Sequence, residues 1–342
     1  MLFALDLGNK QTKIKSEKIE KVFPSYFVEA SLYGNRSFFG ALKAERDTKD
    51  YESTNDKGTT YVWGTELDLS VSVTDTAGFG LSRYTSREFQ LLADFALAEM
   101  ASYENCDEPV SATVVMGLPS EDFKNSKILE HVAEVMKKTH VVTINSNKIV
   151  TVIVDKLYVI PQPLGTVMDI VSDINGVIVD KQFATANIGV VDVGGGTVLI
   201  DALRSMNMAD DTREQLNKGA YSLYKQITTS LTRDNIVLSE YELERAIRLT
   251  DGKWTPDTVH THDLNPWITA ESKIYTRRLA SSIKSTYKGF GRMQKILITG
   301  GTANLLDVEE LQKSLFGLAY IVPESELSNV RGFYKYGKSK VM

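Results

Sequence analysis

The chain has 342 residues, of which 24% are charged and 42% hydrophobic, and its formal net charge is −5. This composition is that of an ordinary globular protein, and the length fits two domains. The acidic balance argues against a protein that holds nucleic acid through bulk electrostatics. No leader pattern and no run of about eighteen apolar residues occurs, so neither export nor a membrane span is predicted. The single cysteine, Cys106, cannot form an intrachain disulfide, which is consistent with the cytoplasm.

The first half of the chain alternates strands and helices, which is typical of an α/β layer. A capping box at Thr85 and Glu88 predicts a helix whose apolar residues recur on one face as far as Met100. Residues 31–80 begin with a polar, irregular stretch, and we expect an exposed insertion or small subdomain there. The other predicted elements, in chain order, are strands over 2–7, 12–15, 22–28 and 111–119, a helix over 120–138, and strands over 141–144 and 149–154.

The second half repeats this plan. Its predicted elements are strands over 187–196 and 198–205, a helix over 212–231, a helix that follows a capping box at Ser239 and Glu242, an amphipathic stretch over 267–287, a strand over 295–301 and a last helix over 305–316. We therefore expect domain I at residues 1–165 plus about 325–342, and domain II at 166–324 with a second subdomain at about 217–285.

Both halves open with a strand that ends in an aspartate, one apolar residue and a glycine: ALDLGNKQTKI at 4–14 and VVDVGGGTVLI at 190–200. Glycines let backbone N–H groups approach an anion, and an acid beside a phosphate requires a cation between them. The pattern therefore indicates phosphate with magnesium. A single copy could equally be a glycine-rich turn with a solvated aspartate. Two copies half a chain apart are more specific, and we expect the two loops to face each other across a cleft and bind one nucleotide.

A third glycine element, ILITGGTANLL at 296–306, ends a strand and starts a helix. Paired glycines would let the backbone lie against a ribose or a purine. Taken alone, the element is more typical of a strand-to-helix turn in which glycines serve packing. Its position after two phosphate-like hairpins favours the nucleoside.

Together these motifs resemble those of the actin, heat-shock-chaperone and sugar-kinase ATPase superfamily. Two phosphate loops at 6–13 and 192–197, a connecting segment at 160–165 and an adenosine motif at 299–303 carry the resemblance, in the family's order. Within that superfamily the length, the short 31–80 region and the ending SNVRGFYKYG most resemble the ParM-type plasmid-segregation actins, particularly those of Gram-positive plasmids. The resemblance implies the actin-like ATPase fold, an α/β fold of two duplicated domains around a nucleotide cleft.

The resemblance also implies a site for Mg²⁺ and the phosphates of ATP or GTP. Asp6 and Asp192 match the two acids that hold the metal, largely through water, because Mg²⁺ keeps much of its hydration shell. Lys13 matches a phosphate-contacting lysine, with a solvated strand lysine as the alternative. The residues that match the β- and γ-phosphate loops are Gly8, Asn9, Lys10 and Gln11 in the first and Gly194, Gly195, Gly196 and Thr197 in the second.

Gln162, in IPQPLG, matches the residue that orients the attacking water. A neutral glutamine is not a strong base, so its role would be positioning, and hydrolysis would be slow. A rigid crossover between two prolines is the alternative for this residue. For the nucleoside, Gly300, Gly301 and Thr302 match the adenosine motif directly, whereas Asn217, Lys218, Gly219 and Glu244 match family contacts only roughly, and Glu244 would also suit a solvated helix face.

The function that the resemblance implies is an ATP-dependent filament that assembles from copies of itself and moves plasmid DNA, while hydrolysis destabilises its subunits. Contact with DNA would pass through a ParR-like DNA-binding adaptor on a centromere-like plasmid site in the bacterial cytoplasm, and no membrane is implied. The main alternative is a small-molecule kinase of the same superfamily, because a shared fold does not fix function. A cell-shape actin is a weaker option, since no amphipathic membrane helix is evident at the N-terminus.

Overall fold

The computed structural model describes residues 1–33, 47–65, 67, 74, 75, 78, 80–104, 108–257, 259–288, 290 and 293–341, so Cys106 lies outside the described residues. The chain divides into two compact units: unit 1 is Met1–Lys181 with Asn329–Met342, and unit 2 is Gln182–Ser328. The boundary expected after residue 165 falls inside a helix of unit 1, α5 (Gln162–Val171). This helix packs closely on the C-terminal helix α11 (Ser328–Val341), because a Cβ at Gly165 would lie only 2.3 Å from the Phe333 ring.

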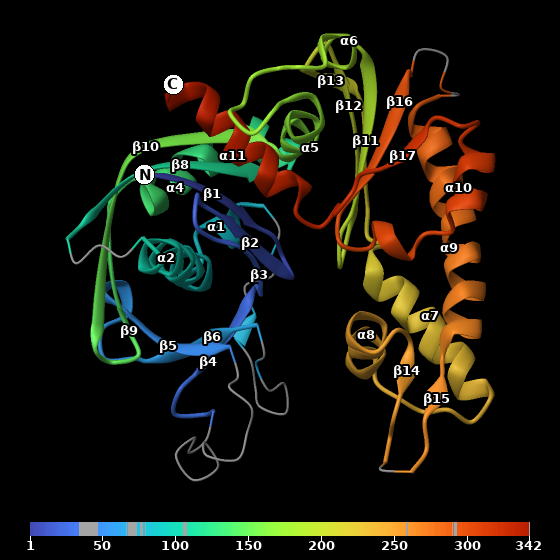
Figure 1. The fold of residues 1–342 in the computed structure, drawn as a ribbon, viewed down its shortest axis with the longest axis horizontal. Coiled ribbons are helices and arrows are strands. Elements are labelled where there is room, and N and C mark those ends of the chain that lie inside the picture. Colours follow the sequence, from blue (N-terminus) through green and yellow to red (C-terminus); the bar gives the residue numbers. More distant parts are fainter. Residues whose placement is uncertain are drawn as a thin grey trace. The chain divides into compact units, whose positions relative to one another are not determined.

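Unit 1 is built on one mixed sheet. Its strands are β1 (Leu2–Leu7), β2 (Gln11–Lys15), β3 (Glu20–Pro24), β4 (Tyr26–Glu29), β5 (Thr48–Ser53), β6 (Tyr61–Gly64), β7 (Thr74–Asp75), β8 (Val110–Leu118), β9 (Thr139–Ile144) and β10 (Lys148–Pro161). Their order among the described residues is β3-β2-β1-β8-β10-β9-β5-β6-β4-β7. The sheet curves around α2 (Arg87–Ser102), whose buried side chains fill the core of the unit (Figure 1). The other helices are α1 (Leu81–Tyr84), α3 (Ser120–Lys124) and α4 (Ser126–Met136), and the short helix α6 (Lys181–Ala184) crosses the boundary into unit 2.

Three expectations for unit 1 need correction. The N-cap of α2 is Ser86 rather than Thr85, and its side chain accepts a hydrogen bond from the Phe89 N–H. The helix expected over 120–138 is two helices, because Asn125 leaves the helical conformation and its side chain caps α4. Part of the stretch expected to be irregular is β5, which pairs with both β6 and β9.

Unit 2 repeats the strand arrangement of unit 1. Its main strands are β11 (Asn187–Val193), β12 (Val198–Arg204), β13 (Asn207–Leu216), β16 (Lys295–Thr299) and β17 (Ala319–Ile321), in the order β13-β12-β11-β16-β17. As in β3-β2-β1-β8-β10, the first three strands are antiparallel and the last three parallel. The two halves of the chain therefore share one topology, as the repeated pattern predicts.

The helices of unit 2 are α7 (Ala220–Arg233), α8 (Glu240–Leu249), α9 (Asn265–Thr286) and α10 (Val308–Ser314), and a small ribbon is formed by β14 (Lys253–Trp254) and β15 (His262–Asp263). The expected helix over 212–231 was wrong in its first part, because residues up to Leu216 pair with β12 as the edge strand β13. Ser239 caps α8 with the predicted capping box. The helix over 305–316 is not the last, since α11 follows it.

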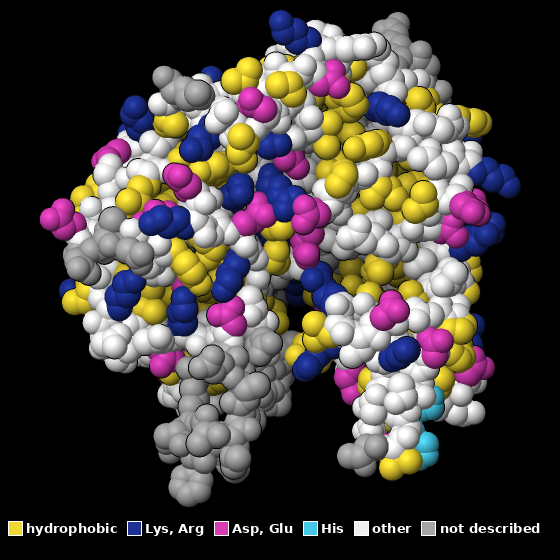
Figure 2. All heavy atoms as spheres, viewed as in Figure 1, with side chains coloured by type: hydrophobic (Ala, Val, Ile, Leu, Met, Phe, Trp, Pro, Cys, Tyr) yellow, Lys and Arg dark blue, Asp and Glu magenta, His cyan; other side chains and the backbone are white. Residues whose placement is uncertain are grey.

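None of the described helices combines the length and the apolar character that crossing a bilayer requires. On the face shown in Figure 2, Lys and Arg side chains are interspersed with Asp and Glu side chains.

Candidate functional site

The first predicted acid, Asp6, is buried at the end of β1 and accepts two hydrogen bonds through its side chain. The Gln162 Nε2 donates to one carboxylate oxygen at 3.0 Å, and the Lys13 Nζ lies 3.3 Å from the other. Lys13 stands directly opposite Asp6 in the β1–β2 hairpin, and Gln162 is the first residue of α5. The structure thus brings together three predicted site residues, of which Gln162 is 156 residues from Asp6 in the sequence.

The turn that follows Asp6 is closed by a hydrogen bond from the Gly8 N–H to the Gln11 carbonyl at 3.0 Å. A Cβ at Gly8 would lie 2.8 Å from that carbonyl oxygen, so the turn requires glycine. Ser25 fixes the turn from one side: its hydroxyl donates to the Gly8 carbonyl at 2.6 Å and its N–H donates to the Lys10 carbonyl at 2.9 Å. Because a trans peptide points its N–H away from its C=O, the N–H groups that follow these two carbonyls face away from Ser25.

Two residues near this turn were not predicted from the sequence. Arg83 is buried, and its guanidinium donates to the Leu7 carbonyl, immediately before Gly8. The Gly78 N–H donates to the Asn9 side chain at 3.3 Å. The segment GFGLSRY offered no signal beyond an arginine that follows closely spaced glycines, so only the fold could place it here.

The second hairpin repeats the geometry of the first. Asp192 is half-buried at the end of β11, and the Gly194 N–H donates to the Thr197 carbonyl at 2.9 Å. In both copies the aspartate lies two residues before the glycine, and the acceptor lies three residues after it. The sequence repeat is therefore also a repeat of backbone conformation.

The carbonyls of the second turn accept hydrogen bonds from N–H groups at the start of α7. The N–H groups of Gly219, Ala220 and Tyr221 donate to the carbonyls of Gly196, Gly194 and Gly195 at 3.2, 3.0 and 3.0 Å. With three successive carbonyls directed at α7 and no cis peptide among the described residues, the N–H groups of residues 195–197 face the opposite way. Successive N–H groups with one direction form an anion-binding concavity. This geometry fits phosphate.

The third glycine element lies against the second hairpin. Gly300 has φ +91°, and a Cβ there would lie 2.4 Å from a carboxylate oxygen of Asp192. The Thr302 N–H donates to the Val193 carbonyl at 3.0 Å. The turn over residues 300–302 and the aspartate of the second hairpin are thus neighbours in unit 2, as a shared ligand would require.

Glu244 and Lys218, which match the family's nucleoside contacts only roughly, have different surroundings from each other. Glu244 forms an ion pair with Arg248 at 3.2 Å, and Arg248 also pairs with Glu326 at 3.0 Å, so Glu244 is not simply a solvated helix residue. Burial, with Glu244 nearby, raises the pKa of Tyr224 to about 12. The Lys218 carbonyl instead accepts a hydrogen bond from the Tyr275 hydroxyl, and Lys218 lines a cavity beside α9.

No group of three His, Cys, Asp or Glu side chains that could hold a metal directly occurs in the part of the chain that the structure describes. In each unit taken by itself, the single carboxylate at the end of β1 or of β11 nevertheless fits a hydrated Mg²⁺, which binds through one or two carboxylates, waters and substrate phosphates. The donor set and the N–H groups of the turns are compatible with a magnesium-bound phosphate.

Comparisons with known proteins identify actin-like domains in both halves of the chain. Residues 4–165 match the N-terminal domain of actin-like proteins, and residues 187–316 match the Alp7A C-terminal domain. The crystal structure of apo psk41 ParM has a TM-score of 0.78 and 22% identity, covering 99% of this chain and 97% of that chain. The crystal structure of Ta0583, an archaeal actin homologue, matches with a TM-score of 0.76 and 16% identity, covering 99% of this chain and 99% of that chain. The crystal structure of the actin-like protein Alp7A also matches with a TM-score of 0.76 and 16% identity, covering 99% of this chain and 96% of that chain. No curated protein sequence matches the chain.

Proposed function

Because the chain belongs to the actin-like proteins of the ParM and Alp7A type and has their fold, we propose that it is a nucleoside triphosphatase that assembles into filaments from copies of itself. The observation that carries the proposal is the repeated turn. The turn with Asp6 and Gly8 and the turn with Asp192 and Gly194 share one conformation. Each contains an acid and N–H groups that face away from the hydrogen-bonded carbonyls. Such a pair suits the phosphate tail of a nucleotide.

In each turn, the N–H groups that face away from the engaged carbonyls would donate to phosphate oxygens. Asp6 and Asp192 would hold Mg²⁺ through water, and Lys13 would add positive charge near the first turn. When bound, Mg²⁺ neutralises charge on the phosphates. The turn over residues 300–302 would lie along the nucleoside, and the proposed nucleotide is ATP or GTP.

Gln162 would position the attacking water. Its Nε2 is used as a donor to Asp6, so its Oε1 remains as an acceptor for a proton of that water. A glutamine positions the water without strong basicity, so most of the rate must come from charge stabilisation, and turnover would be slow.

The proposed role of the filament is the segregation of plasmid DNA in the bacterial cytoplasm, with hydrolysis destabilising subunits. Contact with DNA would pass through a ParR-like adaptor bound to a centromere-like site. The net charge of −5 and the interspersed charges in Figure 2 support an indirect contact, because direct binding to DNA needs a basic surface.

Light scattering tests the proposal. Purified protein is titrated through the micromolar range before and after addition of Mg-ATP or Mg-GTP, and phosphate release is followed in parallel. We expect scattering to rise only above a threshold concentration and to decay as nucleotide is consumed. A flat trace despite nucleotide binding, with turnover that needs an added metabolite, would instead support a small-molecule kinase.

A further inference from the structure

A cavity of about 260 Å³ lies within unit 2, between α7, α9 and the end of β13. From α9, its lining includes Tyr275, Arg278, Leu279 and Ser282, which recur at the spacing of one helical face. Tyr275 and Leu279 are buried, so they form an apolar and aromatic floor. This volume is at the small end of ligand pockets and suits a single ring system with one or two substituents.

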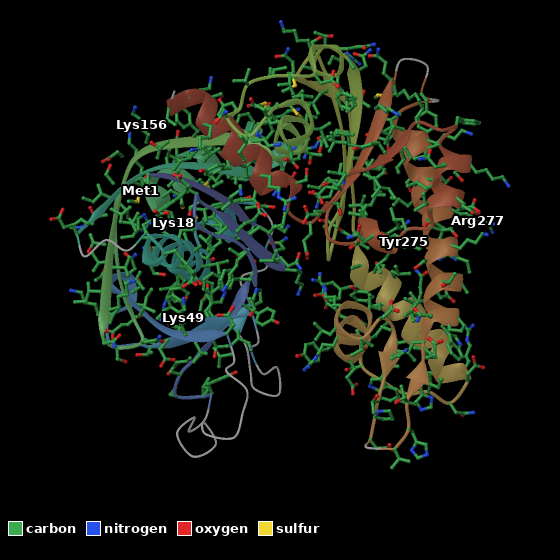
Figure 3. All side chains as sticks on the ribbon, in the orientation of Figure 1. Met1, Lys18, Lys49, Lys156, Tyr275 and Arg277 are labelled. Atoms are coloured by element: carbon green, nitrogen blue, oxygen red, sulfur yellow. The ribbon has the colours of Figure 1, made fainter. Side chains whose placement is uncertain are left out.

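The cavity is positively charged. Lys218 and Arg278 line it, and neither has an ion-pair partner among the described residues. The next residue of α9, Arg277, behaves differently, because it pairs with Glu310 at 2.9 Å. Tyr275 and Arg277 project from opposite sides of α9 (Figure 3). Since the lining contains no carboxylate, the two cations are available to a bound anion.

Gln226, on α7, also lines the cavity, but its Oε1 is buried beneath the cavity surface and has no hydrogen-bond partner in the described part of the chain. The Tyr275 hydroxyl donates to the Lys218 carbonyl, so its proton is already used within the protein.

This cavity lies on the side of α7 away from Glu244, although Lys218, one of the roughly matched nucleotide candidates, lines it. Ser222 and Gln226, which line it, are four residues apart and share one face of α7. Tyr224, which lies near Glu244 and Arg248, is two residues from each of them and therefore faces away. Lys218 nevertheless directly precedes Gly219, whose N–H donates to the second turn at Gly196.

We propose that this cavity is a binding site for a small organic anion, with a carboxylate or phosphate between Lys218 and Arg278 and a planar body on Tyr275 and Leu279. The class is an aromatic or heteroaromatic acid. Such a ligand would bind behind the second phosphate-type turn and would not occupy the nucleotide site.

Indole-3-acetate has this chemistry and is the probe for a titration by ligand-detected NMR in the presence of saturating nucleotide. We expect a Kd on the order of 0.1–1 mM, as ligand efficiency allows for a fragment. Tryptamine, which replaces the acid with an amine, should bind at least about tenfold more weakly. Arg278→Gln should weaken indole-3-acetate binding about tenfold, because it removes a charged hydrogen bond.

Arg277→Gln is the matched control, since it removes the same charge one residue away but outside the cavity, and the affinity should stay within about twofold. Circular dichroism checks that both variants are folded. Absence of indole-3-acetate binding to the wild type, equal losses in the two variants, or displacement of the probe by nucleotide would each overturn the proposal.

Discussion

Gln162 donates a hydrogen bond to Asp6 at 3.0 Å, although 156 residues separate them in the chain. Both side chains are buried, and both carry a predicted role. The contact fixes which end of the glutamine amide remains available, because a carboxylate can accept only from Nε2. A residue proposed to position water is thus held by a residue proposed to bind the metal.

Gln162→Ala should lower the turnover number about 10- to 100-fold, while the nucleotide Kd changes less than about threefold, because the side chain would act on the water rather than on the ground state. Filaments should then persist longer after nucleotide addition. Phosphate release and light scattering measure both effects. Gln182→Ala, an exposed glutamine on α6, is the control. Wild-type turnover in Gln162→Ala would exclude the positioning role.

Asp192→Ala should reduce hydrolysis at least about 100-fold and leave the fold intact, because Asp192 is only half-buried and its proposed task is metal binding. The free energy of unfolding should change by less than about 1 kcal/mol. Asp155→Ala, at an exposed position of β10, should change neither quantity. If Asp192→Ala hydrolyses nucleotide like the parent, the assignment of the second turn is wrong.

Gly300→Ala should destabilise unit 2 and abolish nucleotide binding. Its φ is +91°, and the new Cβ would meet Asp192 at 2.4 Å and the Val193 carbonyl at 2.6 Å. Gly317 has φ +76° but open space around it, so Gly317→Ala should cost only backbone strain, about 1 kcal/mol. Urea unfolding compares the two variants. Equal losses of unfolding free energy in the two variants would show that the contact of the new Cβ with Asp192 does not affect stability.

Glu20→Gln should make stability less dependent on pH. Glu20 on β3 pairs with Arg331 on α11 at 2.7 Å and with Lys15 at 2.9 Å. Burial alone would raise the pKa of Glu20, but hydrogen bonds from Arg331 and Lys15 outweigh it and lower that pKa below 4.5.

A carboxylate whose pKa is lower in the folded state stabilises the fold above its unfolded pKa, and this contribution disappears as the pH falls through the folded pKa. The free energy of unfolding of the wild type should therefore exceed that of Glu20→Gln by about 1 kcal/mol at pH 7, and the difference should shrink as the pH falls below 4.5 and through the lowered pKa of folded Glu20. Urea unfolding from pH 7 to 3 measures it. Glu17→Gln, at an exposed residue, serves as the control, and a constant difference at all pH values would contradict the prediction.

The elements that sequence patterns located correctly are those with strong local signals. The β1 strand, the capping box of α8 and the long helix α9 have periodicity or caps that do not depend on distant partners. The errors fall where pairing with another strand determines the secondary structure. The pattern predicted residues 212–216 as the start of a helix, yet hydrogen bonding to β12 makes them the end of the edge strand β13. β5 has little periodicity, yet it is held between β6 and β9.

The sequence by itself determined the repeated Asp-x-Gly hairpins and the glycine turn at residue 300, because each is a short backbone conformation that needs particular residues. Only the tertiary structure decided that Gln162 and Lys13 meet at Asp6, that Arg83 donates to the Leu7 carbonyl, and that Lys218 lines the cavity beside α9. The physical reason is that local conformation is set by neighbouring residues, whereas side-chain contacts depend on how sheets and helices pack.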